Sequence, residues 1–170
     1  MNVDAFSLAL GLLTLAAAGM AVAALAGRLR RIGGLRATSS LALTASAGIA
    51  TVAMLGSLTY SEYFHFVPCE LCWYQRIAMY PLALMLGVAA WRDDLDIRRY
   101  AIPLASIGAT ISAWHVLVQR VPSIEGGSCD LNAPCTVMWV DTFGVLTIPT
   151  MALVGFLSII VLLATTRSEP

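Results

Sequence analysis

The chain has 170 residues, of which 59% are hydrophobic and 12% are charged, and its mean hydropathy is +0.81. Several apolar stretches approach the roughly 20 residues that a helix needs to cross a bilayer, so the composition indicates an integral membrane protein. All ten basic residues are Arg, and ten acidic residues balance them to a formal net charge of zero. No basic surface for nucleic acid is therefore expected, and nucleic-acid binding is excluded.

The hydropathy pattern predicts five membrane-spanning helices. In chain order they cover residues 6–26, 41–60, 69–90, 100–119 and 148–164. The expected fold class is an all-α integral membrane bundle. The first apolar stretch is not preceded by the basic residues of a secretory signal peptide, and an Arg cluster follows it instead, so we expect an uncleaved anchor.

The loops between these spans differ in charge. Residues 27–36 contain four Arg and no acidic residue, and residues 91–99 contain three Arg and three Asp. The positive-inside rule places both loops in the cytoplasm. The loops at 61–68 and 121–147 then face outward together with the N-terminus. We therefore expect a multi-pass protein of the cell membrane with two loops on its extracytoplasmic face.

The four cysteines of the chain all fall at this outward side. Cys69 and Cys72 form a C-x-x-C motif at the start of the third span, where helix-terminal amides favour a thiolate. Cys129 and Cys135 lie in the loop 121–147, among turn-forming residues that let two Cα atoms approach the roughly 4.4–6.8 Å of a disulfide. Because disulfides persist outside the cytoplasm, the sequence predicts two redox pairs formed by all four cysteines.

Two polar residues inside the spans accompany the cysteines. Arg76 shares a helical face with Cys69, Cys72 and Tyr80, and lies about 10 Å below Cys69. An unpaired guanidinium at that depth is costly, so we expect a partner for it. His115, near the outer end of the fourth span, lies at a similar depth. The two side chains predict a pocket for a polar ligand head, with a snorkelling Arg and a packing His as the alternatives.

The second half of the outer loop carries a periodic apolar pattern. Trp139, Phe143 and Leu146 recur at helical spacing in a stretch that is too short to span the membrane. The pattern predicts a short helix, either on the membrane surface or in an ordinary loop.

Other cysteine chemistries compete with a redox relay. A four-cysteine zinc site would use the same side chains, but it leaves Arg76 and His115 unexplained. Two inert structural disulfides are a further alternative. A c-type haem requires His directly after the second Cys of the motif, and position 73 is Trp, so a c-type haem site is excluded.

An ordered set of motifs resembles the DsbB family of disulfide bond formation proteins, closest to its BdbC-like branch. The resemblance covers about residues 41–166 and is carried by Pro68-Cys69-Glu70-Leu71-Cys72-Trp73-Tyr74-Gln75-Arg76, Met79-Tyr80-Pro81-Leu82, Trp114-His115, Cys129, Cys135, Phe143-Gly144 and Thr147-Ile148-Pro149. Vitamin K epoxide reductase relatives also combine a helical bundle, quinone and four cysteines. In those relatives the loop pair precedes the C-x-x-C motif, whereas here it follows.

The resemblance implies a function for each site residue. Members of the family reoxidise a DsbA-like (BdbD-like) thioredoxin-fold oxidase outside the membrane and pass its electrons to a membrane quinone, ubiquinone or menaquinone. Carried over to this chain, Cys129 would form the mixed disulfide with that partner and Cys135 would exchange with Cys69. Cys72 would face the quinone, with Arg76 and His115 as its binding residues. The resemblance implies no metal.

The chain departs from the four-helix pattern of the family in its first span. We expect residues 1–40 to form an extra N-terminal helix and cytoplasmic loop, and residues 41–170 to form the four-helix bundle with the redox loop 121–147. Gly11, Ala18 and Gly19 could give the extra helix a small-residue packing face. Two alternative functions stay open, namely an epoxide-reductase-like quinone reductase and a non-catalytic membrane subunit with structural disulfides.

Overall fold

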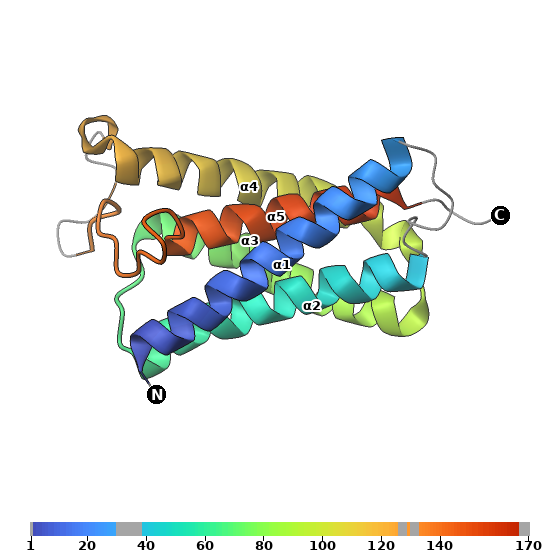
Figure 1. Cartoon of the computed structure of the whole chain (residues 1–170), viewed down its shortest axis with the longest axis horizontal. Helices are drawn as coiled ribbons and strands as arrows, with labels where there is room; N and C mark the ends of the chain where they lie inside the picture. The colour runs from blue at the N-terminus through green and yellow to red at the C-terminus, as the bar shows by residue number, and fades with distance from the viewer. Residues whose placement is uncertain (1, 30–38, 126–128, 130–132, 167–170) are drawn as a thin grey trace.

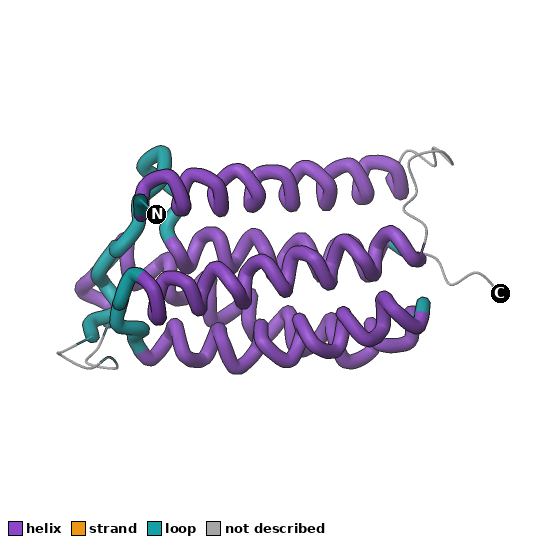
Figure 2. Tube along the Cα trace, turned by 90° about the horizontal axis from the view of Figure 1, so that it is seen from below, coloured by secondary structure: helices purple, strands orange, loops and turns teal. Residues whose placement is uncertain are grey.

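The structure, a computed structural model, describes residues 2–29, 39–125, 129 and 133–166. This part of the chain is all-helical, and its long helices lie side by side in one bundle (Figure 1, Figure 2). The helices are α1 (Val3–Leu29), α2 (Ser39–Leu58), α3 (Glu70–Arg92), α4 (Arg98–Arg120) and α5 (Ile148–Thr165). A π-helical turn, Thr59–Tyr63, prolongs α2. The predicted fold class is confirmed, and each predicted span falls on one helix.

Length and composition identify most of these helices as membrane spans. Within the described residues, four helical segments are long and apolar enough to cross a bilayer: Val3–Leu29, Ser40–Tyr63, Leu95–Arg120 and Ile148–Thr165. Helix α3 has 23 residues, a spanning length, but Glu70, Gln75 and Arg76 make it less apolar. It packs against both α2 and α4 within the bundle. The chain is therefore a multi-pass membrane protein in which α3 carries polar side chains at its N-terminal end, beside the C-x-x-C pair.

The core lies between α2, α3, α4 and α5 and is built largely from small residues. Gly108 of α4 shows why, because a Cβ atom at this position would lie 2.3 Å from Cζ of Phe156 in α5. The fully buried Phe156 ring therefore packs directly on the α4 backbone. Leu82 and Leu86 of α3 and Ile159 of α5 are buried in the same cluster.

Helix α1 packs along α5 at the surface of this core. The buried side of α1 includes Gly11, Ala17, Ala21 and Ala24, and a Cβ at Gly11 would lie 3.4 Å from Leu146. The predicted small-residue face is thus buried at Gly11 and half-buried at Ala18, whereas Gly19 is exposed and faces away from the bundle, so close packing at Gly19, on a partner, stays a prediction. Eight residues turn a helix by about 80° beyond whole turns, so the two glycines point in different directions.

Both cysteine pairs lie at one end of the bundle, together with the N-terminal end of α1 (Figure 1). The turn between α3 and α4 lies at the other end, where Asp93 ends α3 with a left-handed backbone, φ 54°, and Asp94 caps the turn that follows. The expected common end of the two pairs is confirmed. The side of the membrane that this end faces stays a prediction. Most of the Arg cluster at 27–36 that supports it lies outside the described residues.

The predicted helix over Trp139, Phe143 and Leu146 is wrong. These residues belong to a loop in which Thr142 and Leu146 form an isolated antiparallel bridge. Phe143 and Gly144, between them, have φ values of 60° and 71°, which a right-handed helix does not allow. The tight turn lets Leu146 point back toward Gly11 of α1, so this loop ties α1 to the start of α5.

Candidate redox site

The C-x-x-C pair is held by the start of α3. Cys69 is the N-cap residue, and its sulfur accepts the backbone N–H of Cys72 at 3.4 Å. The two sulfurs lie 2.8 Å apart as free thiols, with Cys69 buried and Cys72 half-buried. Helix-terminal amides and this cap place a developing thiolate at the first cysteine of the motif.

The loop pair forms a disulfide between Cys129 and Cys135, whose Cα atoms are 5.9 Å apart. The predicted pairing is therefore confirmed, although the turn residues 126–128 and 130–132 lie outside the described part of the chain. The carboxylate of Glu125 accepts the backbone N–H of Cys135 at 3.2 Å. Cys135 is 1% exposed, whereas Cys129 is half-buried. The more accessible residue of this disulfide is thus Cys129.

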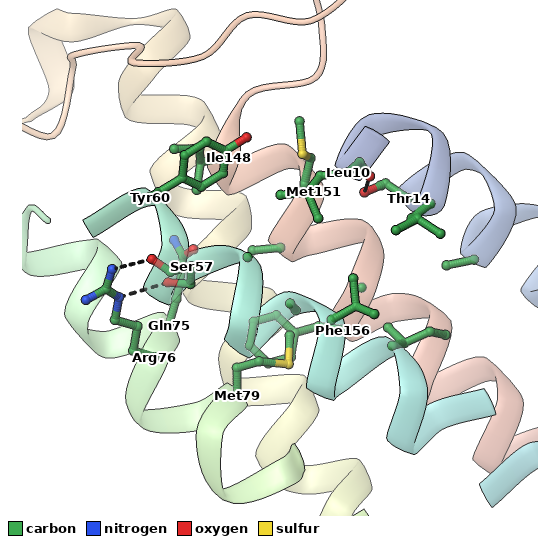
Figure 3. A pocket seen from close by; sticks show the side chains of 18 of the residues that line it. Leu10, Thr14, Ser57, Tyr60, Gln75, Arg76, Met79, Ile148, Met151 and Phe156 are labelled. Atoms are coloured by element: carbon green, nitrogen blue, oxygen red, sulfur yellow. Dashed lines mark hydrogen bonds between the residues drawn. The ribbon is translucent and has the colours of Figure 1, made fainter. Parts of the chain in front are cut away.

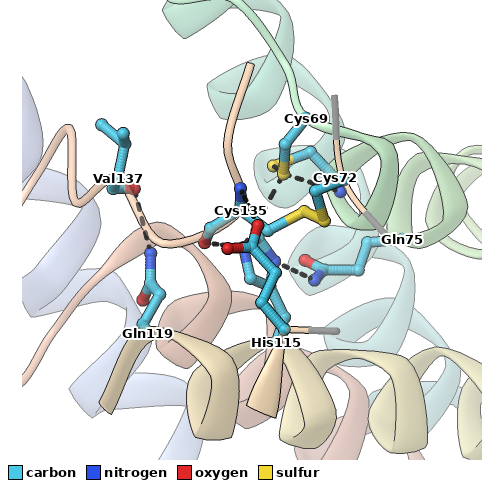
Figure 4. Close-up of a disulfide and its surroundings, with 9 residues drawn as sticks. Cys69, Cys72, Gln75, His115, Gln119, Cys135 and Val137 are labelled. Carbon is cyan, nitrogen blue, oxygen red and sulfur yellow. Dashed lines mark hydrogen bonds between the residues drawn. A yellow bond between two sulfur atoms is a disulfide. The ribbon is translucent and has the colours of Figure 1, made fainter. Parts of the chain in front are cut away.

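The two pairs, far apart in sequence, meet in one buried cluster (Figure 4). Cys69, Cys135 and Val118 of α4 form its centre. Cys72 and Cys129 pack against this centre from the helix side and the loop side. The fold therefore brings the buried members of both pairs together, which is the arrangement that thiol–disulfide exchange between them requires.

His115 joins the two pairs from α4. Its imidazole is 2% exposed, and Nε2 lies 3.7 Å from Cys69 Sγ and 3.1 Å from the carbonyl oxygen of Cys135. The amide Nε2 of Gln75 lies 2.9 Å from Nδ1. When Gln75 donates to Nδ1, the imidazole proton sits on Nε2 and points at the Cys135 carbonyl and the Cys69 sulfur.

Arg76 has the partner that its depth predicted. Its Nε donates to Ser57 Oγ at 2.9 Å, and Nη2 donates to the Ser57 carbonyl oxygen at 3.0 Å, which joins α3 to α2 (Figure 3). The guanidinium carbon also lies 5.2 Å from the ring centroid of Trp73. Ser57 uses two of the five guanidinium N–H groups, so the side chain retains donor capacity beside Cys72.

A cavity of about 380 Å³ adjoins Cys72 and Arg76. Its wall is mostly apolar, and its polar groups gather at the end near the cysteines, where it includes Cys72, Gln75 and Arg76 of α3 (Figure 3). Tyr80 also borders it, and the buried Tyr80 hydroxyl has no hydrogen-bond partner among the described residues. Cys69 and His115 border a separate small cavity of about 20 Å³. The larger cavity has the size of small-molecule sites, commonly about 300–1,000 Å³, and combines an apolar wall with few polar groups.

Several residues of the site could not be identified from the sequence. Ser57 and Gln75 hold Arg76 and His115, and Glu125 holds the loop disulfide. Gln119 binds the Val137 carbonyl oxygen and the Thr147 hydroxyl, which fixes the loop to α4 and α5. A polar residue inside an apolar span is a signal that could have singled out Gln75.

A metal ion competes for one part of the site. The ligand atoms of Cys69, Cys72 and His115 all lie within 4.8 Å of one another, so these three residues could hold a metal ion. The four-cysteine zinc site does not fit, because Cys129 and Cys135 are joined in a disulfide and a disulfide sulfur is not a thiolate ligand. The same three residues equally suit thiol chemistry, because His115 faces Cys69 and the Cys135 carbonyl oxygen.

A multi-pass helical bundle in which a C-x-x-C pair packs against a loop disulfide defines a membrane thiol–disulfide oxidoreductase. Residues 36–166 match the family described as disulfide bond formation protein DsbB. The chain therefore belongs to the DsbB family, and this membership implies a partner protein whose thiols are oxidised.

Curated relatives agree with this membership. Disulfide bond formation protein C of Bacillus subtilis (strain 168) is 47% identical over 128 residues, which cover 75% of this chain and 93% of the relative. A probable disulfide formation protein of Oceanobacillus iheyensis is 49% identical over 66% of this chain and 79% of its own length. A probable disulfide formation protein of Deinococcus radiodurans is 41% identical over 71% of this chain and 85% of its own length. No solved structure matches the chain.

Proposed function

We propose that the chain oxidises the dithiol of a thioredoxin-fold oxidase outside the cell membrane and passes the electrons through its two cysteine pairs to a membrane quinone. One observation carries this proposal. Cys69 packs in the buried cluster with Cys135, whereas Cys72 of the same motif borders the large apolar cavity. The C-x-x-C motif thus has one sulfur toward the loop pair and one toward a site for a lipid-soluble molecule.

The first exchange takes place at the loop pair. A thiolate of the partner attacks Cys129, the more accessible residue, and displaces Cys135 as a thiolate. The second partner thiol then attacks the partner sulfur of this mixed disulfide and releases Cys129. The partner leaves as a disulfide, and both loop cysteines are left reduced. The half-buried position of Cys129 and the 1% exposure of Cys135 support this division of roles.

The second exchange joins the two pairs. The Cys135 thiolate attacks Cys69 in a Cys69–Cys72 disulfide, Cys72 leaves as a thiolate, and Cys129 then attacks Cys135 to restore the loop disulfide. The products are a loop disulfide and two helix-mouth thiols, which is the combination found in the structure. We propose that His115 supports this exchange, because Nε2 faces both Cys69 and the Cys135 carbonyl. Its predicted contact with the quinone stays a prediction.

The residues around the large cavity suit a quinone headgroup. Arg76 brings N–H donors and positive charge beside Cys72, and the buried Tyr80 hydroxyl lacks an acceptor among the described residues. A quinone bound there would take up two electrons and two protons as Cys69 and Cys72 close to a disulfide. Arg76 favours the thiolate of Cys72 and donates to a carbonyl oxygen, and the apolar wall keeps water from the reacting sulfur.

The proposal is tested with the purified full-length protein, a reduced thioredoxin-fold dithiol oxidase and quinone, with quinol formation followed by absorbance. The expected result is one quinol for each partner disulfide formed. A partner whose second cysteine is replaced by Ser should accumulate a mixed disulfide with Cys129 of the wild-type chain, because its remaining thiolate can open the Cys129–Cys135 disulfide but the thiol that releases Cys129 is missing. Partner oxidation without quinol formation would refute the proposed acceptor. If no adduct forms at Cys129, the assignment of Cys129 to the partner is refuted.

A further inference from the structure

The large cavity extends well beyond the residues that suit a quinone ring. We propose that α1 and α2 form a lateral slot that holds the polyprenyl tail of the quinone, with the ring at Cys72 and Arg76. This inference rests on the proposed function. It concerns α1, which ends at Leu29 and precedes the family match that begins at residue 36.

The cavity is long, and most of its polar groups lie in one part of it; Thr14 of α1 is an exception, and its hydroxyl donates to the Leu10 carbonyl oxygen of its own helix. Along α2 its wall runs from Tyr60 to Ala45, which is about 22 Å at the rise of an α-helix. Along α3 its wall runs only from Cys72 to Tyr80, about 12 Å. Beyond Tyr80 the wall comes from α1, α2 and α5. A ligand with a polar ring and a long apolar chain matches this distribution.

Helix α1 supplies one side of the inner part. Leu10, Leu13, Ala16, Ala17 and Met20 border the cavity over about 15 Å of helix. Leu13, Ala16 and Met20 are also exposed at the molecular surface, so the slot opens sideways toward the lipid. A sideways opening lets a tail that already lies in the bilayer enter without crossing water.

The opposite side of the slot contains a glycine that leaves it open. Gly48 of α2 borders the cavity and is exposed, and a Cβ atom at this position would meet nothing within 4 Å. Gly87 of α3 is also exposed and also has nothing near a built Cβ, but it does not border this cavity. The two glycines therefore form a matched pair for substitution.

Contacts at the outer end hold α1 in the position that the slot requires. The Tyr60 hydroxyl donates to Ser7 Oγ at 2.9 Å in a buried hydrogen bond, and the Phe6 and Tyr60 ring centroids are 5.2 Å apart. Tyr60 itself borders the cavity, so the same residue anchors α1 and closes the end where the ring would lie. Leu10 packs over Gly56, where a Cβ would lie 2.9 Å from Leu10 Cδ1.

The first test compares quinones that share a ring but differ in the tail. Benzoquinone and naphthoquinone pairs, each with and without a polyprenyl chain, are titrated as electron acceptors of the full-length protein. Gly48→Leu should raise the apparent KM of the tailed quinones about tenfold, because extra side-chain volume overpacks the slot. The tailless quinones should change less than about twofold, and Gly87→Leu should change neither class.

The contribution of α1 is tested from the other side of the slot. Ala16→Phe, which narrows the slot from α1, should repeat the effect of Gly48→Leu. Ala23→Phe should not, because Ala23 lies exposed on the same face two turns further along α1, where it does not border the cavity. If Gly48→Leu acts selectively but Ala16→Phe does not, α1 is not part of the slot. Equal loss for tailed and tailless quinones would place the tail elsewhere. If the wild type reduces neither class, the proposed function itself fails.

A binding measurement complements turnover. A polyprenyl quinone with a photoreactive diazirine at the tail should label peptides of α1 and α2, and Gly48→Leu should abolish this labelling. Excess unlabelled tailed quinone should compete, and tailless quinone should compete more weakly, because it occupies the ring site without the contacts of the slot. Labelling by a diazirine phospholipid that tailed quinone does not displace would show that lipid chains occupy the slot and would overturn the proposal.

Discussion

The two cysteine pairs carry the same functional groups in opposite settings. Cys69 and Cys72 are fixed by a helix cap and a helical turn, next to an apolar cavity. Cys129 and Cys135 form a disulfide within a loop, at a sequence separation of 6, and Cys129 is the more accessible member. A pair that reduces a lipid-soluble acceptor benefits from a fixed place beside an apolar site. A pair that exchanges with a protein benefits from a loop. The contrast supports the proposal that each pair has a different reaction partner.

The largest effect is expected at Cys72. Cys72→Ser should abolish quinol formation with the partner protein and also with a small dithiol as electron donor, because no disulfide can form beside the cavity. The measurement is quinol absorbance under both donors. Retained quinol formation with the small dithiol would show that electrons reach the quinone without Cys72, and the contrast between the pairs would then be wrong.

Arg76 should have the next largest effect and sharpens the assignment of the cavity. Arg76→Met removes charge and donors, and should cost about 1.5–3 kcal/mol of apparent quinone affinity, the strength of a hydrogen bond to a charged group. Arg76→Lys should fall between Met and wild type, since it keeps the charge but loses the planar fork. Quinone titrations measure both variants.

Ser57→Ala is the matched control for Arg76, because it removes one partner of the guanidinium and leaves the guanidinium itself in place. A smaller loss of affinity than in Arg76→Met is expected. If Arg76→Met folds normally and its quinone affinity is unchanged, the guanidinium snorkels and the quinone binds elsewhere.

His115 lies between the two cysteine pairs, so its substitution should slow the thiol–disulfide exchange between the pairs. His115→Ala should slow electron transfer from the loop pair to the helix-mouth pair about fivefold, as expected for a hydrogen bond of about 1 kcal/mol. When reduced partner is mixed with fully oxidised protein without quinone, the first equivalent of partner should be oxidised normally and the second more slowly. Equal slowing of both equivalents would move His115 out of the exchange between the pairs.

Glu125 should show the smallest effect. Glu125→Ala removes the acceptor for the Cys135 N–H and should raise the apparent KM for the partner about twofold, whereas Glu125→Gln keeps an acceptor and should change it less. Partner titrations at saturating quinone measure the difference. If Glu125→Gln strongly raises the apparent KM for the partner but does not affect turnover with a small dithiol, Glu125 instead makes a charge contact with the partner.

Much of the fold and part of the site could be predicted because the signals are local. Apolar stretches of spanning length mark the helices, and cysteines and an intramembrane Arg stand out by residue type. Ser57 and Gln75 could not be assigned, since their roles depend on which helices become neighbours. The helix predicted around Phe143 is wrong because the spacing of apolar residues carries no information about a positive φ, although Gly144 beside it is a turn signal.

The role of α1 was also beyond the sequence. Small residues such as Gly11 predict close packing, and α1 does pack on α5. The pattern does not say that the neighbouring face, with Leu13 and Ala16, borders a cavity shared with α2. That relation exists only in the folded bundle, where α1 crosses α5 and its N-terminal end approaches the C-terminal end of α2 (Figure 1).

The central claim, that the two pairs form one relay with separate entrances, is tested most directly by a variant with Cys129→Ser and Cys135→Ser. Quinol formation is measured with the reduced partner protein and, separately, with a small dithiol that can reach Cys69 and Cys72. The account predicts that partner-driven quinol formation is lost while dithiol-driven formation persists. Partner-driven formation that survives the loss of both loop cysteines would contradict it.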